Sequence, residues 1–136
     1  METIHINNDI PVFYVTASSF PEGIMDALEK IHMLTPPLAG RRFFGVSRPE
    51  GEGGIVYRAA AEQMEEGEGR ALGCDCLTLF KGLYITLVIK DYPADVAAIG
   101  RAFDLLLSQP GLDPQGYCVE WYLNDKDVRC MVRLEQ

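Results

Sequence analysis

The sequence predicts an α+β fold of two pseudo-symmetric βαββ units, with one antiparallel sheet and both helices on one face of it. Residues 11–64 and 76–134 each show the order strand, helix, strand, strand. In each half, a polar residue, an aromatic residue and a proline precede the helix, in the same order. The length of 136 residues fits a single domain over residues 1–136. A groove between two such units is a natural ligand pocket.

The first unit is predicted element by element. Residues 12–18 are rich in branched and aromatic side chains and predict a strand. Residues 19–22 have a capping-box pattern with an early proline, which predicts the start of a helix. Residues 42–47 and 55–63 predict two strands, joined by a Gly- and Glu-rich link at 49–54. The apolar stripe of the helix is Ile24, Ala27, Leu28, Ile31 and Leu34.

The segments before and after the first unit are predicted in the same way. Residues 1–10 are polar, and we expect them to be loosely held. The acidic stretch at 65–69 predicts an exposed loop, with a charged lid or a partner-binding patch as the alternative. Residues 76–90 form the longest strand-like stretch, which Gly82 either bulges or divides. Asp91 is expected to cap the second helix. That helix has an apolar stripe of Val96, Ile99, Phe103, Leu106 and Leu107.

The last predicted hairpin contains the residue on which the functional prediction depends. Residues 117–123 form an aromatic and branched strand with one carboxylate, Glu120, inside it. Side chains alternate between the faces of a strand. Alternation places Cys118, Glu120 and Tyr122 on one face and Val119, Trp121 and Leu123 on the other. The first face is therefore neither a plain core face nor a plain solvated one.

Two interpretations of Glu120 stay open from the residues alone. A four-residue loop at 124–127 would place Glu120 beside Met131, with Arg129 and Arg133 diagonal to it and within reach. Glu120 would then be a cross-strand ion pair on a solvated face, and such pairs are individually weak. The alternative is that Glu120 binds a ligand.

Composition excludes some classes of protein. The net charge of −8 argues against nucleic-acid binding, which requires a basic surface. No stretch is long and apolar enough to span a membrane. The sequence shows no secretory signal. No second pair of cysteines or histidines lies at metal-ligand spacing from Cys74 and Cys76. We therefore expect a cytoplasmic protein with free thiols and neither metal nor other cofactor, and with Cys118 and Cys130 on opposite faces. The sequence leaves the oligomeric state open.

Several short motifs occur together in one known family. They are Gly82-Leu83-Tyr84, the helix at 94–107, the loop at 110–116, Glu120-Trp121-Tyr122, and Tyr57 on an earlier strand. In these motifs residues 11–134 resemble the GyrI-like family, the AraC-type effector-binding domains of multidrug-sensing transcription regulators and of free-standing small proteins. Glu120 and Tyr122 match the family's Glu-x-Tyr motif. The chain shows no helix-turn-helix segment, so we expect no direct binding to DNA.

The resemblance implies a pocket between the two units with a partly buried glutamate that attracts cationic or aromatic ligands. Carried onto this sequence, the glutamate is Glu120 and its motif partner is Tyr122. The candidate aromatic walls are Tyr84, Tyr57, Phe44 and Trp121, for which core packing is the alternative. The chain departs from the family at Lys90-Asp91-Tyr92, where many members have a glycine-centred motif, and in having arginines that could compete for Glu120.

Three functions follow from the resemblance. The leading one is a free-standing small-molecule-binding protein whose pocket is centred on Glu120. The second is a hydrolase of reactive small-ring compounds, in which Glu120 is a general base. The third is an acidic inhibitor of the gyrase-inhibitor type, which binds a protein partner. Whether the protein is an enzyme stays open at this point.

Overall fold

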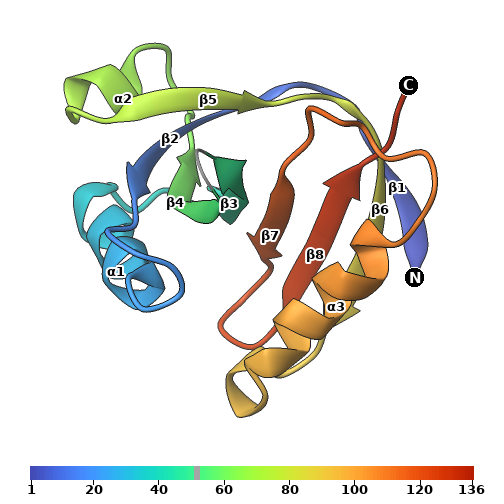
Figure 1. Ribbon diagram of the computed structural model, residues 1–136. Coiled ribbons are helices and arrows are strands. Elements are labelled where there is room, and N and C mark those ends of the chain that lie inside the picture. The colour runs from blue at the N-terminus through green and yellow to red at the C-terminus, as the bar shows by residue number, and fades with distance from the viewer. Residues whose placement is uncertain (51–52) are drawn as a thin grey trace.

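The computed structural model describes residues 1–50 and 53–136 (Figure 1). Within these residues, eight strands form one antiparallel sheet in the order β1-β6-β8-β7-β3-β4-β2-β5. The elements are β1 Glu2–Ile6, β2 Ile10–Thr16, α1 Ile24–Leu34, β3 Phe43–Glu50, β4 Gly54–Glu62, α2 Glu68–Ala71, β5 Asp75–Leu79, β6 Gly82–Ile89, the 3-10 helix Tyr92–Ala94, α3 Ala97–Leu107, β7 Cys118–Tyr122 and β8 Val128–Arg133.

The two predicted βαββ units are present as β2-α1-β3-β4 and β6-α3-β7-β8. They join through the β3–β7 pair, in which Gly45 lies opposite Glu120. Each unit also takes an edge strand from the other half of the chain, because β1 pairs with β6 and β5 pairs with β2. The prediction that residues 1–10 are loosely held is therefore wrong, since β1 is part of the sheet.

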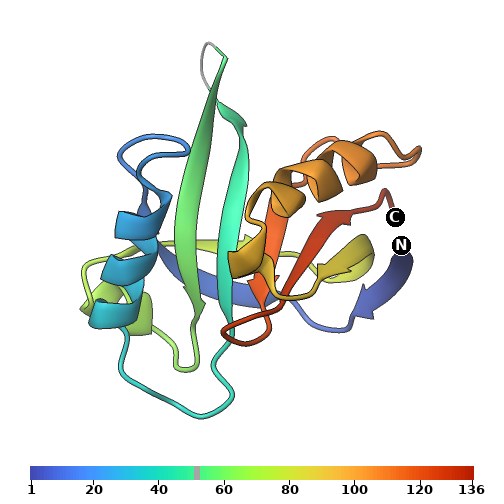
Figure 2. The same cartoon turned by 90° about the horizontal axis from the view of Figure 1, so that it is seen from below.

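Both long helices lie on one face of the sheet, as predicted. Figure 2 shows α1 and α3 on the same side, with β3 and β4 between them in this view. α1 packs on β2 and β4 through Ala27 and Ile31, and α3 packs on β6 and β8 through Ala102 and Leu106. These contacts bury part of each predicted apolar stripe against the sheet, whereas Leu34, Val96 and Leu107 of the predicted stripes are exposed. The midline of the sheet, at β3 and β7, lies between the two helices.

The face of the sheet away from the helices encloses its own core. One apolar cluster there draws residues from all eight strands: Ile6, Ile10, Val12, Phe44, Val46, Ala60, Leu79, Tyr84, Val119 and Met131. Side chains from both edge strands can meet in one cluster only because the sheet curls around it, which the strand twist favours (Figure 1). This core fixes which face of β3 and β7 is available for a site.

The helices begin later than predicted. α1 follows Gly23, which makes no side-chain capping bond, so the capping box at 19–22 is wrong. α3 follows Val96, and Asp91 instead adopts a left-handed conformation with φ of 52°. The chain then forms the short 3-10 helix, and the Tyr92 amide donates to the Lys126 carbonyl at 2.7 Å. Tyr92 is thereby held outside α3, beside the loop between β7 and β8.

Two linking segments also differ from the predictions or refine them. The acidic stretch 65–69 is not a free loop, because Glu68 begins α2 and binds the buried Arg41 through two contacts of 2.8 Å. Gly82 divides the long strand-like stretch into β5 and β6. The predicted link at 49–54 falls partly outside the described residues. In the described part of the chain, no helix has both the length and the apolar character needed to cross a membrane.

Candidate functional site

The register of β7 against β8 decides what surrounds Glu120. Glu120 pairs with Cys130 and Tyr122 pairs with Val128, one residue away from the predicted register. The Leu123 amide donates to the Asp127 carbonyl at 3.0 Å, so the loop that this bond closes is residues 124–126, one residue shorter than expected. A one-residue slip exchanges the faces of a strand. Met131 therefore lies on the opposite face, and the prediction that it neighbours Glu120 is wrong.

The same slip places Cys118 and Cys130 on one face. Cys118 pairs with Val132 and Cys130 with Glu120, and both cysteines pack in the apolar cluster under α3. The prediction of opposite faces is therefore wrong. Burial raises the pKa of the Cys118 thiol to about 11 and that of the Cys130 thiol to about 12, and the nearby Glu120 charge adds to both shifts. Both thiols are consequently poor nucleophiles at neutral pH.

The two arginines that could pair with Glu120 are bound elsewhere. Arg129 donates to the Glu2 carboxylate at 3.0 Å and to the Thr86 hydroxyl at 2.9 Å. Arg133 donates to the Asp113 carboxylate at 2.8 Å. Across residues 1–50 and 53–136, no lysine or arginine forms an ion pair with Glu120. The interpretation of Glu120 as a cross-strand ion pair is therefore wrong.

A chain of hydroxyl groups ends at Glu120. The carboxylate is only 9% exposed, and the Tyr122 hydroxyl donates to its Oε1 at 2.8 Å. The hydroxyls of Tyr57 and Tyr122 lie 2.9 Å apart. Each phenol has one proton to donate. When Glu120 is ionised, Tyr122 donates its hydrogen bond to the carboxylate, so Tyr57 must be the donor in the hydrogen bond to Tyr122.

Gly45 leaves the space that this chain of hydroxyls occupies. It lies directly across from Glu120 on the other neighbour of β7. A Cβ at this position would overlap the Tyr57 hydroxyl and ring edge. The missing side chain thus allows Tyr57, which comes from β4, to reach across β3 to Tyr122. A glycine inside a strand often marks such a close approach.

Burial changes the acidity of every member of this group. It raises the pKa of Glu120 to about 7, and the hydrogen bond from Tyr122 lowers it by less. Burial, together with the Glu120 charge, raises the pKa of Tyr57 and of Tyr122, so both phenols keep their protons. The site therefore holds one carboxyl group that titrates near neutrality beside two permanent hydrogen-bond donors.

A pocket of about 540 Å³ opens between α1 and the loop after β7. Its lining residues are Met25, Leu28, Glu29, His32, Phe43, Tyr92, Tyr122, Asn124 and Asp125. The His32 and Phe43 rings stack with centroids 4.2 Å apart, and the Tyr92 and Tyr122 rings meet at 5.9 Å. Tyr122 belongs to both the pocket and the hydroxyl chain, so it connects the aromatic pocket to the buried carboxylate. We call this the aromatic pocket.

The structure brings together three of the six predicted site residues. Glu120, Tyr122 and Tyr57 form the hydroxyl chain. Phe44, Trp121 and Tyr84 belong instead to the core on the other face, where the Phe44 and Trp121 rings lie 6.1 Å apart. The Tyr84 hydroxyl there donates to the Phe80 carbonyl at 2.6 Å.

The sequence analysis missed Phe43, Tyr92 and His32, which line the aromatic pocket. Strand alternation places Phe43 and Phe44 on opposite faces, and only the pairing of Phe43 with Tyr122 shows which of the two belongs to the site. His32 follows the buried Ile31 on α1, so helical spacing alone does not indicate its side of the helix. Asp91 was expected to cap the second helix, which would place Tyr92 in the first turn of that helix. Tyr92 instead lies in the short 3-10 helix.

Solved structures share the fold of this chain, while no family model matches it and no curated protein matches it in sequence. An integron cassette protein from Vibrio cholerae aligns with a TM-score of 0.73 at 14% identity, over 98% of this chain and 95% of its own. The protein SAV2435, solved bound to tetraphenylphosphonium, aligns with a TM-score of 0.71 at 10% identity, over 98% and 93%. A hydrolase from Listeria innocua aligns with a TM-score of 0.61 at 10% identity, over 98% and 90%. The fold and the site define an α+β protein that has an aromatic pocket with a buried carboxylate behind it.

The close fit at Gly45 leads to a first prediction. Gly45→Ala should displace Tyr57, break its bond to Tyr122 and destabilise the protein by about 1–3 kcal/mol, since overpacking a core has this cost. Urea unfolding of the two proteins measures the difference. Gly54→Ala is the control, because a Cβ there meets no atom within 4 Å. An unchanged midpoint for Gly45→Ala would contradict the proposed fit.

The raised pKa of Glu120 leads to a second prediction. Because burial raises the pKa of Glu120 from the ordinary glutamate pKa of 4.5 to about 7, the folded protein binds more protons than the unfolded one between these pH values. Its stability relative to Glu120→Gln should therefore fall as the pH rises through this window, by about 2 kcal/mol between pH 5 and pH 8. Denaturant unfolding at both pH values measures the change.

The control for this experiment is Glu66→Gln, at an exposed position in another segment. Its stability should follow that of the natural protein at both pH values. A constant difference between the natural protein and Glu120→Gln would mean that Glu120 titrates normally and is not desolvated.

Proposed function

We propose that this protein binds small aromatic cations in the aromatic pocket, with Glu120 as the counter-charge behind Tyr122. The observation that carries the proposal is a buried carboxylate with no cationic partner in the described chain, hydrogen-bonded to a tyrosine that lines a pocket. We further propose that the chain is a divergent relative of the GyrI-like family, which its Glu120-Trp121-Tyr122 motif suggested.

A buried charge without a partner is costly, and this cost favours a cationic ligand. Ionised Glu120 has exchanged water for one hydrogen bond from Tyr122. Burying a carboxylate without compensation is strongly unfavourable, so a cation that approaches it regains part of the lost free energy. The aromatic faces of Tyr92, Tyr122 and Phe43 add cation–π attraction of about 0.5–2 kcal/mol each when they are desolvated.

The shape of the pocket suits a flat or branched aromatic ligand. Its volume of about 540 Å³ lies within the range of small-molecule sites. Met25 and Leu28 of α1 supply apolar contacts opposite the tyrosines. SAV2435, which shares the fold, was solved with tetraphenylphosphonium, an aromatic cation. This similarity supports the choice of ligand class without identifying the natural ligand.

A second candidate function is hydrolysis of reactive small-ring compounds. One observation favours it: burial raises the pKa of Glu120 to about 7, which suits a general base at neutral pH. A shared fold with a hydrolase from Listeria innocua is in keeping with this. In this reaction Glu120 would take a proton from a water whose oxygen bonds to a ring carbon, the strained bond from that carbon to the ring heteroatom would break, and Glu120 would return the proton to the released heteroatom. Mass spectrometry of strained-ring compounds after incubation would detect the addition of water, which Glu120→Gln should abolish.

The binding proposal gives the third prediction. Glu120→Gln keeps the shape and the acceptor for Tyr122 but removes the charge. Affinity for tetraphenylphosphonium at pH 8 should fall about tenfold or more, because charge-assisted contacts contribute about 1.5–3 kcal/mol. Isothermal titration of both proteins measures the loss.

The pH provides an independent test of the same charge. As the pH is lowered from 8 to 5, the affinity of the natural protein should fall more than that of Glu120→Gln, since Glu120 becomes neutral only in the natural protein while the other pocket residues are the same in both. Glu66→Gln again serves as the control. Equal affinity in the natural protein and Glu120→Gln at pH 8 would refute Glu120 as the counter-charge.

A further inference from the structure

We propose that the preferred ligand of the aromatic pocket carries two positive charges, one at Tyr122 and Glu120 and one at the mouth between Glu29 and Asp125. This inference rests on the proposed function and narrows its ligand class from aromatic cations to aromatic dications. The positions of the carboxylates that line the pocket support this narrower ligand class.

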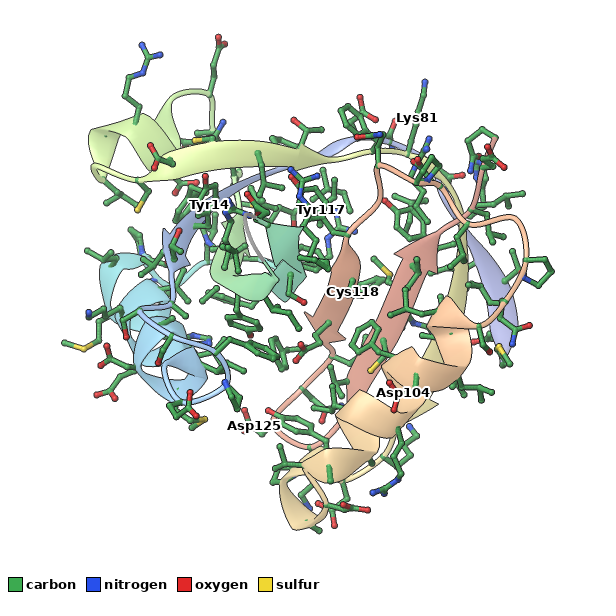
Figure 3. All side chains as sticks on the ribbon, in the orientation of Figure 1. Tyr14, Lys81, Asp104, Tyr117, Cys118 and Asp125 are labelled. Carbon is green, nitrogen blue, oxygen red and sulfur yellow. The ribbon has the colours of Figure 1, made fainter. Side chains whose placement is uncertain are left out.

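The mouth of the pocket has one carboxylate from each side. Glu29 is exposed on α1, and Asp125 is exposed on the loop between β7 and β8, and both line the pocket. Figure 3 shows Asp125 at the end of that loop, in the gap between α1 and α3. These two charges come from separate elements of the chain, so their convergence results from the fold.

Neighbouring carboxylates on the same elements already have partners. Asp26 of α1 pairs with Lys30 at 3.1 Å, and Asp127 of the loop pairs with Lys90 at 3.4 Å. In the described part of the chain, neither Glu29 nor Asp125 forms an ion pair with a lysine or arginine. Of the described residues that line the pocket, only His32 has a side chain that can become positively charged. The mouth of the pocket is therefore acidic, and no described lysine or arginine neutralises it.

The loop that carries Asp125 is held in place by hydrogen bonds. The Asn124 side-chain oxygen accepts from the amides of Lys126 at 2.8 Å and Asp127 at 2.9 Å. The Asn124 side-chain nitrogen donates to the Asp127 carboxylate at 3.1 Å. The backbone on both sides of Asp125 is therefore ordered before any ligand arrives, which lowers the entropy lost on binding.

The pocket combines acidic positions with aromatic and apolar side chains. Phe43, Tyr92 and Leu28 line it together with Tyr122, Glu29 and Asp125, and the Tyr92 ring lies 5.9 Å from that of Tyr122. A ligand that matches this arrangement has an aromatic middle and a cationic group at each end. A monocation seated at Tyr122 leaves the mouth carboxylates to water, whereas a dication engages both ends.

Two biaryl cations of nearly equal shape test this inference. N-methyl-4-phenylpyridinium carries one charge, and N,N′-dimethyl-4,4′-bipyridinium carries a second one on its other ring. We expect the dication to bind about threefold to tenfold more tightly at low salt, since exposed ion pairs make small contributions. The advantage should shrink as salt is raised, because the mouth is open to solvent. Isothermal titration measures both affinities.

Variants of the mouth separate a local effect from the overall negative charge. Glu29→Gln combined with Asp125→Asn should abolish the preference, so that the dication and the monocation bind this double variant with affinities within about twofold of each other. The charge-matched control combines Glu66→Gln with Asp104→Asn, at two exposed positions that do not line the pocket. It should keep the preference. Each mouth substitution is also made alone, so that one unstable double variant does not decide the result.

The outcomes distinguish this inference from the function on which it rests. Binding of the monocation with no gain for the dication overturns the inference and leaves the proposed function intact. A dication preference that survives in the mouth variants also overturns it, because the preference then comes from the net charge. Failure of both probes to bind the natural protein overturns both proposals.

Discussion

The pairing of β3 with β7 is the constraint on which the rest of the site depends. It joins the two βαββ units and sets Gly45 opposite Glu120. The glycine admits the Tyr57 hydroxyl, which in turn reaches Tyr122 and completes the hydroxyl chain. The same pair places Phe43 beside Tyr122 on the helix-bearing face. A shift of one residue in this pairing would turn one strand over relative to the other, so that either Phe44 would replace Phe43 on that face or Trp121 would replace Glu120 and Tyr122 there.

Burial of the Glu120 carboxylate lowers the stability of the folded protein. A carboxylate at this depth is usually neutralised by an arginine, and the chain has two on the adjacent strand. Arg129 faces the other side of the sheet, and Arg133 is held by Asp113. Local stability is therefore lower than an ion pair or an apolar residue would give, which is common where a site is prepared for a ligand.

Local sequence patterns predicted the fold class and the neighbours that share a strand face with Glu120. They did not predict the strand register or the tertiary contacts. Strand alternation correctly grouped Glu120 with Tyr122, because that grouping depends only on neighbours in sequence. The loop length between β7 and β8 depends on one bond from the Leu123 amide, which no pattern revealed, and the environment of Glu120 changed with it. β1 was missed since its short, polar segment gains its order from β6, far along the chain. Phe43 and Phe44 are adjacent aromatics, so only the register decides which one joins the site.

The exchange of edge strands has a consequence for synthesis of the chain. β1 leaves the ribosome early but has no neighbour until β6, residues 82–89, has emerged. The first βαββ unit likewise lacks its outer strand until β5 follows. Unpaired strand edges attract other chains, and distant pairings form slowly. The nascent chain must therefore keep the edges of β1 and β2 from self-association until more than half of it is made.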